Sequence, residues 1–452
     1  MERNTELKIE KMILWGLWFA NLAIIFGFWF YSSGQFLFNG WSELLLGLGR
    51  LAGLLATFCV LMQFVAMGRL GWLEPIFGMD RLAIFHRRNG IAVLILILLH
   101  PPLISLGYMQ ITGFTMLQQI SYTLLNTPFV AFAALGLLLL LLTICSSIYI
   151  ARKHLKFETW YFVHLANYLA ILLIFGHQFA NGSTLLGNPW FKYYWIGLYV
   201  FTALNLIVWR FLKPVYKFFY HDFKVQQVVA ETPTATSVYI SGKNMQNFKA
   251  EGGQFVLVRF LTKELGLQEH PFSLSMIPDR ERLRLTIRQL GDFTNQVPGL
   301  KPGTPVVVSG PFGSFTQDRQ ITDKVLFIAG GIGITPIRSL IEERVKNNQK
   351  QDAVLVYASR NLKEIALKTE IEHLCSQAKI KLINVLSEEP TYNGEKGYVD
   401  AAILERLVPD IKSRDVFICG PPVMVDKIYP ALEQLRVPKQ LIHAERFSLH
   451  KQ

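Results

Sequence analysis

Six long apolar segments fill most of the first 212 residues of this chain, and they limit its possible folds more than any other feature. They lie at approximately 13–31, 44–67, 88–107, 127–150, 158–179 and 193–212. An α-helix needs about 20 apolar residues to cross the hydrocarbon core of a bilayer. Because each segment has about this length, the sequence predicts six transmembrane helices within a first domain, residues 1–215.

The second half of the chain has the alternating pattern of an α/β protein. Within residues 216–320, short strand-like runs separated by turn residues predict a small antiparallel β-barrel. Its expected strands are 223–230, 236–241, 254–260, 283–288 and 306–309. Within residues 321–452, alternating strands and helices predict a doubly wound parallel sheet. Its expected strands are 325–329, 353–358, 381–386 and 416–419, and its expected helices are 336–347, 363–377, 400–407 and 422–433.

Basic residues are distributed unequally between the two sets of loops that join the apolar segments. The loops of one set, residues 32–43, 108–126 and 180–192, contain a single basic residue, Lys192. The other set contains Arg69, Arg81, Arg87, Arg88, Arg152, Lys153, Lys156, Arg210, Lys213 and Lys217. Basic loops stay in the cytoplasm, so we expect a multi-pass protein of the cell membrane with both termini cytoplasmic. The net charge of +12 then favours anionic lipid over nucleic acid as a partner.

Two of the apolar segments carry two histidines each: His86 and His100 in the third, His164 and His177 in the fifth. Spacings of 14 and 13 residues place the imidazoles of one helix about 20 Å apart along its axis. This separation gives two levels in a hydrocarbon core about 30 Å thick. Neutral imidazole is an axial ligand of haem iron, so two such helices side by side would hold two stacked haems. Unrelated polar residues in a helix bundle would give the same pattern.

The helical geometry of these segments sets two further expectations. A spacing of 14 residues keeps the first pair of histidines on one helix face, whereas 13 residues separate the second pair in azimuth. The fifth helix should therefore tilt, bulge or break, with Gly176 as the candidate position. Pro101 and Pro102, directly after His100, should kink or end the third helix.

Arg50 lies toward the outer end of the second apolar segment. A charge at this depth is costly unless it is paired. In a functional interpretation, Arg50 binds a propionate of the outer haem or guides an anionic product. In a structural interpretation, its side chain extends to the lipid headgroups.

Two motifs in the predicted barrel have side chains suited to a flavin. His270-Pro271-Phe272-Ser273 combines a rigid proline, a flat aromatic ring and a hydroxyl. Ser273 is a candidate hydrogen-bond partner near the flavin N5, and His270 is a candidate contact of the ring or the ribityl chain. Arg288 precedes a glycine turn and Thr294, and a basic side chain before a turn that opens a helix is typical of a pyrophosphate site.

Three motifs in the predicted α/β domain indicate a dinucleotide site. Gly330-Gly331-Ile332-Gly333-Ile334-Thr335-Pro336 lets a pyrophosphate approach the backbone between a strand and a helix. Cys419-Gly420-Pro421 follows the last expected strand at the same sheet edge, with Cys419 near the nicotinamide or acting as a buried structural thiol. Ser359 and Arg360 stand where an adenosine 2′-phosphate would bind, which favours NADPH over NADH. Near the C-terminus, Phe447 is a candidate shield of the flavin face.

In this combination the chain resembles the NADPH oxidase and ferric reductase superfamily in its short bacterial form. The resemblance extends from about residue 13 to 447. In the membrane half it rests on Asp80-Arg81-Leu82-Ala83-Ile84-Phe85-His86-Arg87, His100, His164 and His177. It implies an inner haem on His86 and His164, an outer haem on His100 and His177, and Arg50 beside the outer haem. It implies flavin contacts from His270, Pro271, Phe272, Ser273, Arg288 and Thr294, and nucleotide contacts from Gly331, Gly333, Thr335, Pro336, Ser359, Arg360, Cys419, Gly420 and Pro421.

The resemblance implies electron transfer from cytosolic NADPH through FAD and two haems b to an acceptor outside the cytoplasm. Oxygen, reduced to superoxide, is the first candidate acceptor. A ferric chelate or another extracytoplasmic acceptor is the alternative within the same architecture. A haem-binding membrane scaffold that needs a separate reductase is an alternative of a different class, although the fused nucleotide motifs argue against it. Besides the lipid bilayer, no obligate protein partner is expected.

Overall fold

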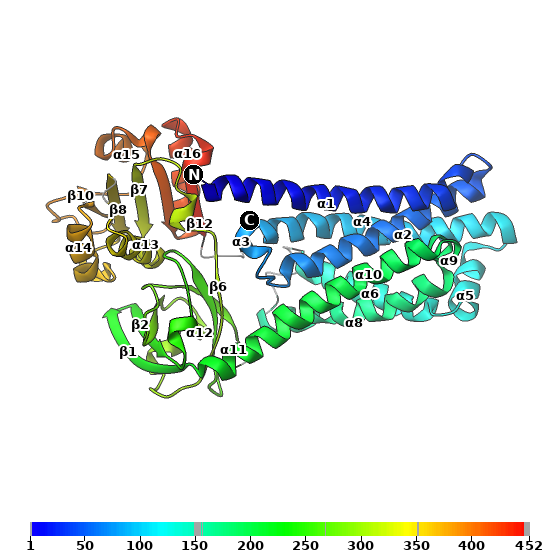
Figure 1. Ribbon diagram of the computed structural model, residues 1–452, viewed down its shortest axis with the longest axis horizontal. Coiled ribbons are helices and arrows are strands. Elements are labelled where there is room, and N and C mark those ends of the chain that lie inside the picture. The colour runs from blue at the N-terminus through cyan, green and yellow to red at the C-terminus, as the bar shows by residue number, and fades with distance from the viewer. Residues whose placement is uncertain (1, 149–154, 156, 267, 350–351, 447–452) are drawn as a thin grey trace. The chain divides into compact units, whose positions relative to one another are not determined.

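A computed structural model of the chain describes residues 2–148, 155, 157–266, 268–349 and 352–446 (Figure 1). The chain divides into two compact units. The helical unit comprises residues 9–73 and 81–211, and the sheet unit comprises residues 1–8, 74–80 and 212–452. The basic residues Arg152, Lys153 and Lys156, on which the predicted orientation partly rests, lie outside the described residues.

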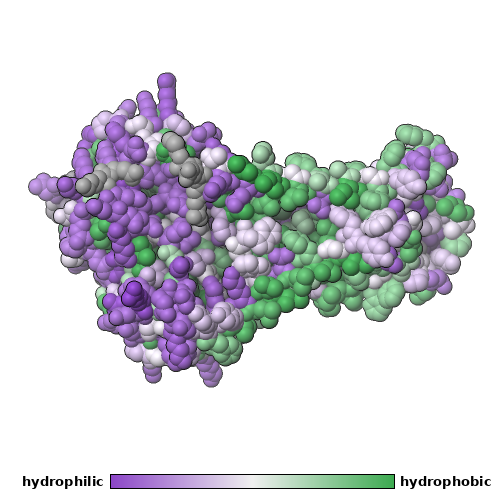
Figure 2. Space-filling view, viewed as in Figure 1, coloured by the Kyte–Doolittle hydropathy of each residue, from purple (hydrophilic) through white to green (hydrophobic). Residues whose placement is uncertain are grey.

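The helical unit is built on helices of membrane-spanning length. Over the described residues, six helices are long and apolar enough to cross a bilayer. Five of them lie in α1 Glu2–Ser32, α2 Trp41–Met67, α4 Met79–Thr112, α6 Val130–Ser147 and α8 Phe157–Asn181. The sixth is Pro189–His221, which begins with α10 Pro189–Asn205 and continues through a π-helical turn into α11 Lys213–His221. Apolar side chains cover much of their visible outer surface (Figure 2), as lipid contact requires. The six predicted spans are confirmed, and the protein is a multi-pass membrane protein.

Shorter helical elements connect or extend these six. They are the 3-10 turn Gly34–Phe36, α3 Glu74–Phe77, α5 Met116–Asn126, α9 Ser183–Gly187, the π-helical turn Leu206–Leu212 and α11 Lys213–His221. The amphipathic helix α5 begins with a capping box in which Thr115 and Gln118 bond each other's backbone N–H groups. Helix α5 was not expected from the sequence.

The structure contradicts parts of two predicted interruptions of the membrane helices. Helix α4 continues through Pro101 and Pro102 to Thr112, so the predicted end of the helix there is wrong, and a kink remains a prediction. In membrane helices, neighbouring groups can satisfy the backbone that proline leaves unpaired. Helix α8 runs without a bulge or break through Gly176, which leaves tilt as the remaining alternative. Gly176 is needed instead for packing, because a Cβ there would lie 2.9 Å from the ring of Phe129.

The first part of the sheet unit is the predicted barrel, made of two three-stranded antiparallel sheets with the orders β1-β2-β5 and β4-β3-β6. The strands are β1 Lys224–Thr232, β2 Ala235–Ser241, β3 Phe255–Phe260, β4 His270–Ser273, β5 Arg282–Arg288 and β6 Val306–Phe312, and the short helix α12 is Asp292–Gln296. Alternate residues such as Val256 and Val258 are buried in a common core. The motif expected between strands, His270–Ser273, itself forms β4.

The second part of the sheet unit is a six-stranded parallel sheet of order β10-β9-β8-β7-β11-β12. Its strands are β7 Val325–Gly330, β8 Ala353–Ser359, β9 Lys381–Leu386, β10 Glu395–Lys396, β11 Asp415–Gly420 and β12 Ile442–Arg446. Its helices are α13 Ile334–Lys346, α14 Lys368–Gln377, α15 Ala401–Leu407 and α16 Pro422–Gln434. Phe327 packs in the core that holds α13 and α14, whereas Leu326 and Ile328 pack in the core that holds α15 and α16. The doubly wound sheet is confirmed.

The order of this sheet reverses between β7 and β11, since the chain adds β8 and β9 on one side of β7 and β11 and β12 on the other. Ligands of doubly wound sheets bind at such a switch point, beyond the carboxyl ends of the strands. The glycine-rich turn and the Cys419 motif both follow strands that flank it.

Candidate functional site

The four membrane histidines form two close pairs between α4 and α8. The ring centres of His86 and His164 are 6.0 Å apart, and those of His100 and His177 are 6.4 Å apart. An iron held between two imidazoles, about 2 Å from each nitrogen, separates the ring centres by roughly 6 to 6.5 Å. Both pairs therefore have the spacing that axial ligation of a haem requires.

Backbone carbonyls orient the pair formed by His100 and His177. His100 Nδ1 lies 2.8 Å from the carbonyl oxygen of Gly49, and His177 Nδ1 lies 2.5 Å from that of Ile174. An imidazole that donates from Nδ1 presents the lone pair of Nε2 to a metal. The Ile174 carbonyl belongs to the preceding turn of α8, so this contact fixes the orientation of the His177 ring within its own helix.

Glycines of α2 make room for this pair. A Cβ at Gly53 would lie 2.8 Å from His100 Nδ1, and a Cβ at Gly49 would lie 2.9 Å from the side chain of Ile104. Helices in membranes approach closely where small residues line their contact. The close packing of α2 against α4 therefore fixes the position of the His100 ring.

Arg50 is half-buried in α2 and donates a hydrogen bond from Nη1 to Ser33 Oγ at 3.2 Å. No ion pair found among the described residues includes Arg50. The side chain therefore has a neutral partner and keeps its positive charge available to an anionic group.

The other pair has an aromatic neighbour. Trp160 stacks on His164, with ring centres 5.0 Å apart and an interplanar angle of 29°. Across the described residues, no group of three or more histidine, cysteine or acidic side chains converges on one point. The metal-binding possibilities of this helical unit thus rest on histidine pairs, which suit a metal that brings its own equatorial ligands.

In the barrel, two of the predicted flavin residues, His270 and Phe272, pack against the buried ring of Phe293. The ring centre of His270 lies 4.1 Å from that of Phe293, and Phe272 lies 6.1 Å from the same ring at 23°. Ser273, at the end of β4, is 5% exposed. Thr294 does not present a free hydroxyl, because its Oγ1 accepts hydrogen bonds from the backbone N–H groups of Leu290 and Gly291.

Arg288 links the barrel to the α/β domain. It pairs with Glu364 at 3.2 Å, and a Cβ on Gly331 would lie 3.5 Å from its Nη1. The fold therefore brings the predicted flavin-phosphate arginine beside the glycine-rich turn, although 43 residues separate them in the sequence.

The glycine-rich turn has the predicted geometry between β7 and α13. Gly331 has a φ of 51°, and a Cβ on Gly333 would lie 2.2 Å from the carbonyl oxygen of Cys419. These positions need glycine because the backbones of the turn and of β11 touch. Thr335 Oγ1 donates to the carbonyl of Ile332, so it stabilises the turn. Gly420 lies beside Gly330, where an added Cβ would be 3.2 Å from the Gly330 Cα.

Ser359 is the last residue of β8, whereas Arg360 follows the strand. Ser359 is 9% exposed, and Arg360 is exposed and lies 3.8 Å from Glu388. Surface ion pairs of this kind contribute little to stability. The guanidinium of Arg360 is therefore available for a phosphate. Pro336 lies in the first turn of α13, and Pro421 directly precedes α16.

Cys419 is fully buried in β11. Burial raises the pKa of its thiol well above the ordinary value, so the side chain is a neutral thiol rather than a nucleophile. Phe447, the predicted shield of the flavin, lies outside the described residues.

Glu445 is a candidate site residue that sequence reasoning missed. In the register of β11 and β12 it stands directly beside Cys419, and its Oε2 is buried without a hydrogen-bond partner among the described residues. Burial, followed by the charges of Asp80 and Glu74, raises the pKa of its carboxyl well above the ordinary value. The only sequence signal was its place two residues before Phe447, because β12 lacks a continuous apolar run.

The loop that carries Glu74 also belongs to the sheet unit. Glu74 is 3% exposed and accepts a hydrogen bond from the Gly313 backbone N–H at 2.8 Å. Arg319 donates to the carbonyl of Pro75 at 3.0 Å. Residues 74–80 are therefore fixed to the end of β6 and the segment that follows it.

Three known domain types match separate parts of the chain. The Ferric reductase like transmembrane component matches residues 52–175. The FAD-binding domain matches residues 222–315, and the Oxidoreductase NAD-binding domain matches residues 327–429. The last two types occur in FAD- and NAD-dependent oxidoreductases.

Individual proteins show more limited similarity. The reductase subunit of glycine betaine monooxygenase from Pseudomonas aeruginosa is 29% identical over 201 residues, which are 42% of this chain and 55% of that protein. A flavohemoprotein from Oceanobacillus iheyensis is 25% identical over 240 residues, which are 50% of this chain and 59% of that protein. The chain thus spans little more than half the length of these curated relatives.

Among solved structures, the flavohemoglobin of Malassezia yamatoensis has a TM-score of 0.50 at 17% sequence identity, over 88% of this chain and 96% of that chain. At this identity the similarity concerns the fold alone. The domain matches, the six membrane helices and the two folds of the sheet unit agree with one another. The chain therefore joins a ferric reductase-like transmembrane domain to FAD-binding and NAD-binding domains of ferredoxin-NADP reductase type, which is the domain combination of the NADPH oxidase and ferric reductase superfamily.

Proposed function

We propose that this protein transfers electrons from cytosolic NADPH, through FAD and two haems b, to an acceptor on the other side of the cell membrane. The observation that carries the proposal is the presence of two histidine pairs between α4 and α8, with ring centres 6.0 and 6.4 Å apart. Both termini would then be cytoplasmic, and the proposed domains are residues 1–215, 216–320 and 321–452.

In the membrane, His86 and His164 would bind the inner haem and His100 and His177 the outer haem. When bound, haem supplies one-electron chemistry that no side chain here can provide. The carbonyls of Gly49 and Ile174 hold the outer imidazoles in place. Arg50, which lacks a carboxylate partner in the described part of the chain, would bind a haem propionate.

In the sheet unit, His270, Pro271, Phe272 and Ser273 would contact the flavin ring. Arg288 and the turn closed by Thr294 would lie near the pyrophosphate of FAD. The turn Gly330–Gly333, with Ser359 and Arg360, would bind NADPH. Cys419 and Glu445 would line the nicotinamide end, where the thiol is neutral and the raised pKa of the Glu445 carboxyl favours its uncharged form.

Oxygen, reduced to superoxide, is the proposed acceptor. One NADPH supplies two electrons and leaves NADP⁺ and one proton in the cytosol, so two molecules of superoxide should form per NADPH. The purified protein with NADPH should reduce cytochrome c in air in a manner that superoxide dismutase suppresses. Haem that reoxidises in air without superoxide would exclude the oxidase function.

A ferric reductase is the second candidate, favoured by the domain type that matches residues 52–175. The same purified protein should then reduce ferric chelates under nitrogen at a rate that accounts for NADPH consumption. A haem scaffold would behave differently, because with NADPH and FAD alone it could not reduce its own haem.

The haem assignment is tested by spectroscopy of His100→Leu. We expect the ratio of haem to FAD to fall from two to one while the flavin remains bound, and outward electron transfer to stop. Leu99→Ala changes the neighbouring residue of α4, whose side chain is 47% exposed, and as the control it should retain both haems. Two haems in His100→Leu would refute the proposed ligand pair.

A further inference from the structure

A pocket of about 220 Å³ lies in the sheet unit between the barrel and the α/β domain. The barrel contributes Tyr239, Met276, Arg282 and Arg284, and α13 and α14 contribute Arg338, Glu370, His373 and Leu374. None of these residues belongs to the flavin or nucleotide motifs. The lining of the pocket is therefore distinct from the predicted flavin and nucleotide residues, and a ligand there does not depend on the proposed function.

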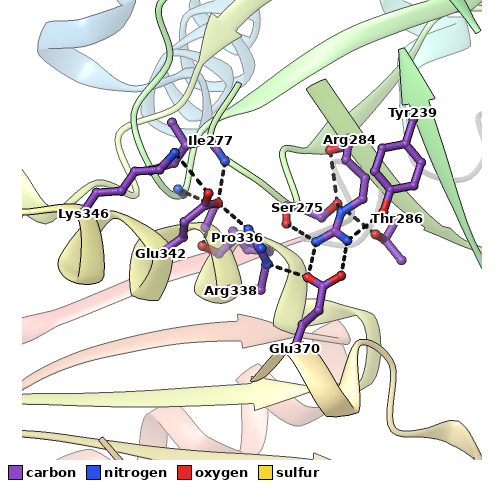
Figure 3. A network of polar contacts seen from close by, with 12 residues as sticks. Tyr239, Ser275, Ile277, Arg284, Thr286, Pro336, Arg338, Glu342, Lys346 and Glu370 are labelled. Atoms are coloured by element: carbon purple, nitrogen blue, oxygen red, sulfur yellow. Dashed lines mark hydrogen bonds and ion pairs between the residues drawn. The ribbon is translucent and has the colours of Figure 1, made fainter. Parts of the chain in front are cut away.

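Two of the three arginines in the pocket are neutralised by carboxylates (Figure 3). Arg284, which is 2% exposed, donates to both oxygens of Glu370 at 2.6 and 2.8 Å. Arg338 donates to Glu370 at 3.1 Å and also pairs with Glu342. Figure 3 shows the Glu370 carboxylate between these two guanidiniums.

Arg282 is the arginine of the pocket without such a partner. Its guanidinium stacks on Tyr239, with Cζ 4.9 Å from the ring centre. Its Nε is buried and has no hydrogen-bond partner among the described residues, and no ion pair found there includes it. A buried donor without an acceptor is costly, and the described residues do not provide an acceptor for this nitrogen.

The charges of the pocket favour an anion. Its lining has three guanidiniums and one carboxylate, a net charge of +2 with His373 neutral. Even with Glu342 included, one positive charge remains, which is that of Arg282. The volume of 220 Å³ exceeds the roughly 30 Å³ that one water occupies, so a small polyatomic anion fits.

We propose that this pocket binds a phosphate group, either as inorganic phosphate or as the phosphoryl group of a small phosphomonoester. The planar fork of a guanidinium matches the oxygens of phosphate in bidentate geometry. Arg282 would be the main ligand from β5, with Arg338 and His373 on the opposite wall. A phosphate there would connect the barrel to α13 and α14 and so stabilise their packing.

The test uses the purified protein with FAD bound and NADP⁺ at saturation, so that the dinucleotide site is already filled. Thermal unfolding, followed by flavin fluorescence, is measured while sodium phosphate is titrated, with sodium chloride at matched ionic strength as the reference. We expect a saturable rise in melting temperature with phosphate and none with chloride. A second titration with glycerol 3-phosphate identifies which form of phosphate binds more tightly.

Arg282→Gln should weaken phosphate binding at least tenfold, and Arg282→Lys should weaken it less because the charge remains. Arg280→Gln removes an exposed arginine two residues earlier and should leave binding unchanged. The flavin absorbance and the melting temperature without phosphate show whether each variant is folded. The proposal is refuted if chloride gives the same shift, if Arg282→Gln binds as the wild type does, or if Arg280→Gln loses binding equally.

Discussion

The two units of this protein build their candidate sites from different materials. In the helical unit, each site is a pair of imidazoles, one from α4 and one from α8. The ring centres are 6.0 Å apart in one pair and 6.4 Å apart in the other. In the sheet unit, the site is formed by backbone at the carboxyl ends of separate strands. Gly333 lies against Cys419, and Cys419 lies beside Glu445 in strand register.

This difference predicts how each site fails. Where backbones touch, any added atom must move a whole strand or helix, so the sheet unit should be intolerant of small changes. Where side chains converge across a helix contact, one site can be lost while the other remains. Substitutions in both units test this contrast, from the largest expected effect to the smallest.

Gly333→Ala should have the largest effect. Its Cβ would lie 2.2 Å from the Cys419 carbonyl oxygen, which forces the turn away from β11 and removes the backbone approach that a pyrophosphate needs. We expect reduction of the flavin by NADPH, measured by anaerobic stopped flow, to slow at least 100-fold while FAD stays bound. Gly299→Ala, with no atom within 4 Å of its Cβ, should react as the wild type does. Equal rates in both variants would contradict the backbone interpretation.

Gly53→Ala should affect only one haem. The added carbon would lie 2.8 Å from His100 Nδ1 and displace that ring from His177. We expect the haem content to fall by about half, with reduction of the remaining haem by NADPH intact, as measured by a reduced-minus-oxidised spectrum. Gly27→Ala in α1, with no atom within 4 Å, is the control. Loss of both haems would show that the two levels are not independent.

Removing Arg284 and removing Glu370 from their ion pair should lower the stability of the protein by different amounts. The Arg284 side chain is 3% exposed and that of Glu370 is 40% exposed. Glu370→Gln leaves a buried charge unpaired and should destabilise the sheet unit by about 3 kcal/mol. Arg284→Met leaves a carboxylate that water can reach and should cost about 1 kcal/mol. Melting temperatures of the two variants test this prediction. A greater loss of stability in Arg284→Met than in Glu370→Gln would contradict it.

The smallest expected effect depends on pH. Burial, with the nearby charges of Glu251 and Asp318, raises the pKa of Glu343 in α13 to about 7. The folded chain then binds this proton more readily than the unfolded chain, so stability falls as pH rises from about 4.5 to about 7. Glu343→Gln should remove this loss and stabilise the protein above pH 7 by about 1 kcal/mol, since the group is partly exposed. Melting curves of the variant and the wild type at pH 5 and pH 8 measure this difference in stability. An equal gain in stability at both pH values would argue against titration of Glu343.

Several site residues could be found from the sequence because their chemistry depends on local order. His86 and His100 lie 14 residues apart in one helix, so the sequence alone fixes their separation along the helix axis. The turn Gly330–Gly333 could be found because it joins a strand and a helix that are adjacent in the sequence. Glu445 could not be found in this way, because its importance comes from pairing with a strand more than 20 residues earlier.

Breaks in a helix were predicted from single residues, and here the tertiary structure decided otherwise. Proline and glycine weaken an isolated helix, which is why Pro101 and Gly176 suggested interruptions. In a packed membrane bundle, the alternative to a helix is an unpaired backbone in lipid. Gly176 remains within its helix and leaves room for the ring of Phe129.

The sequence by itself determined the number of membrane helices, the spacing of the four histidines along two of them and the change to a β-barrel followed by an α/β sheet. These follow from apolar length and from periodicity, which are properties of contiguous residues. Only the tertiary structure decided which groups meet in the sheet unit: Gly333 against Cys419, Glu445 beside Cys419, and Arg282 without an acceptor among the described residues. Such contacts join distant segments, and packing energy, rather than local preference, selects them.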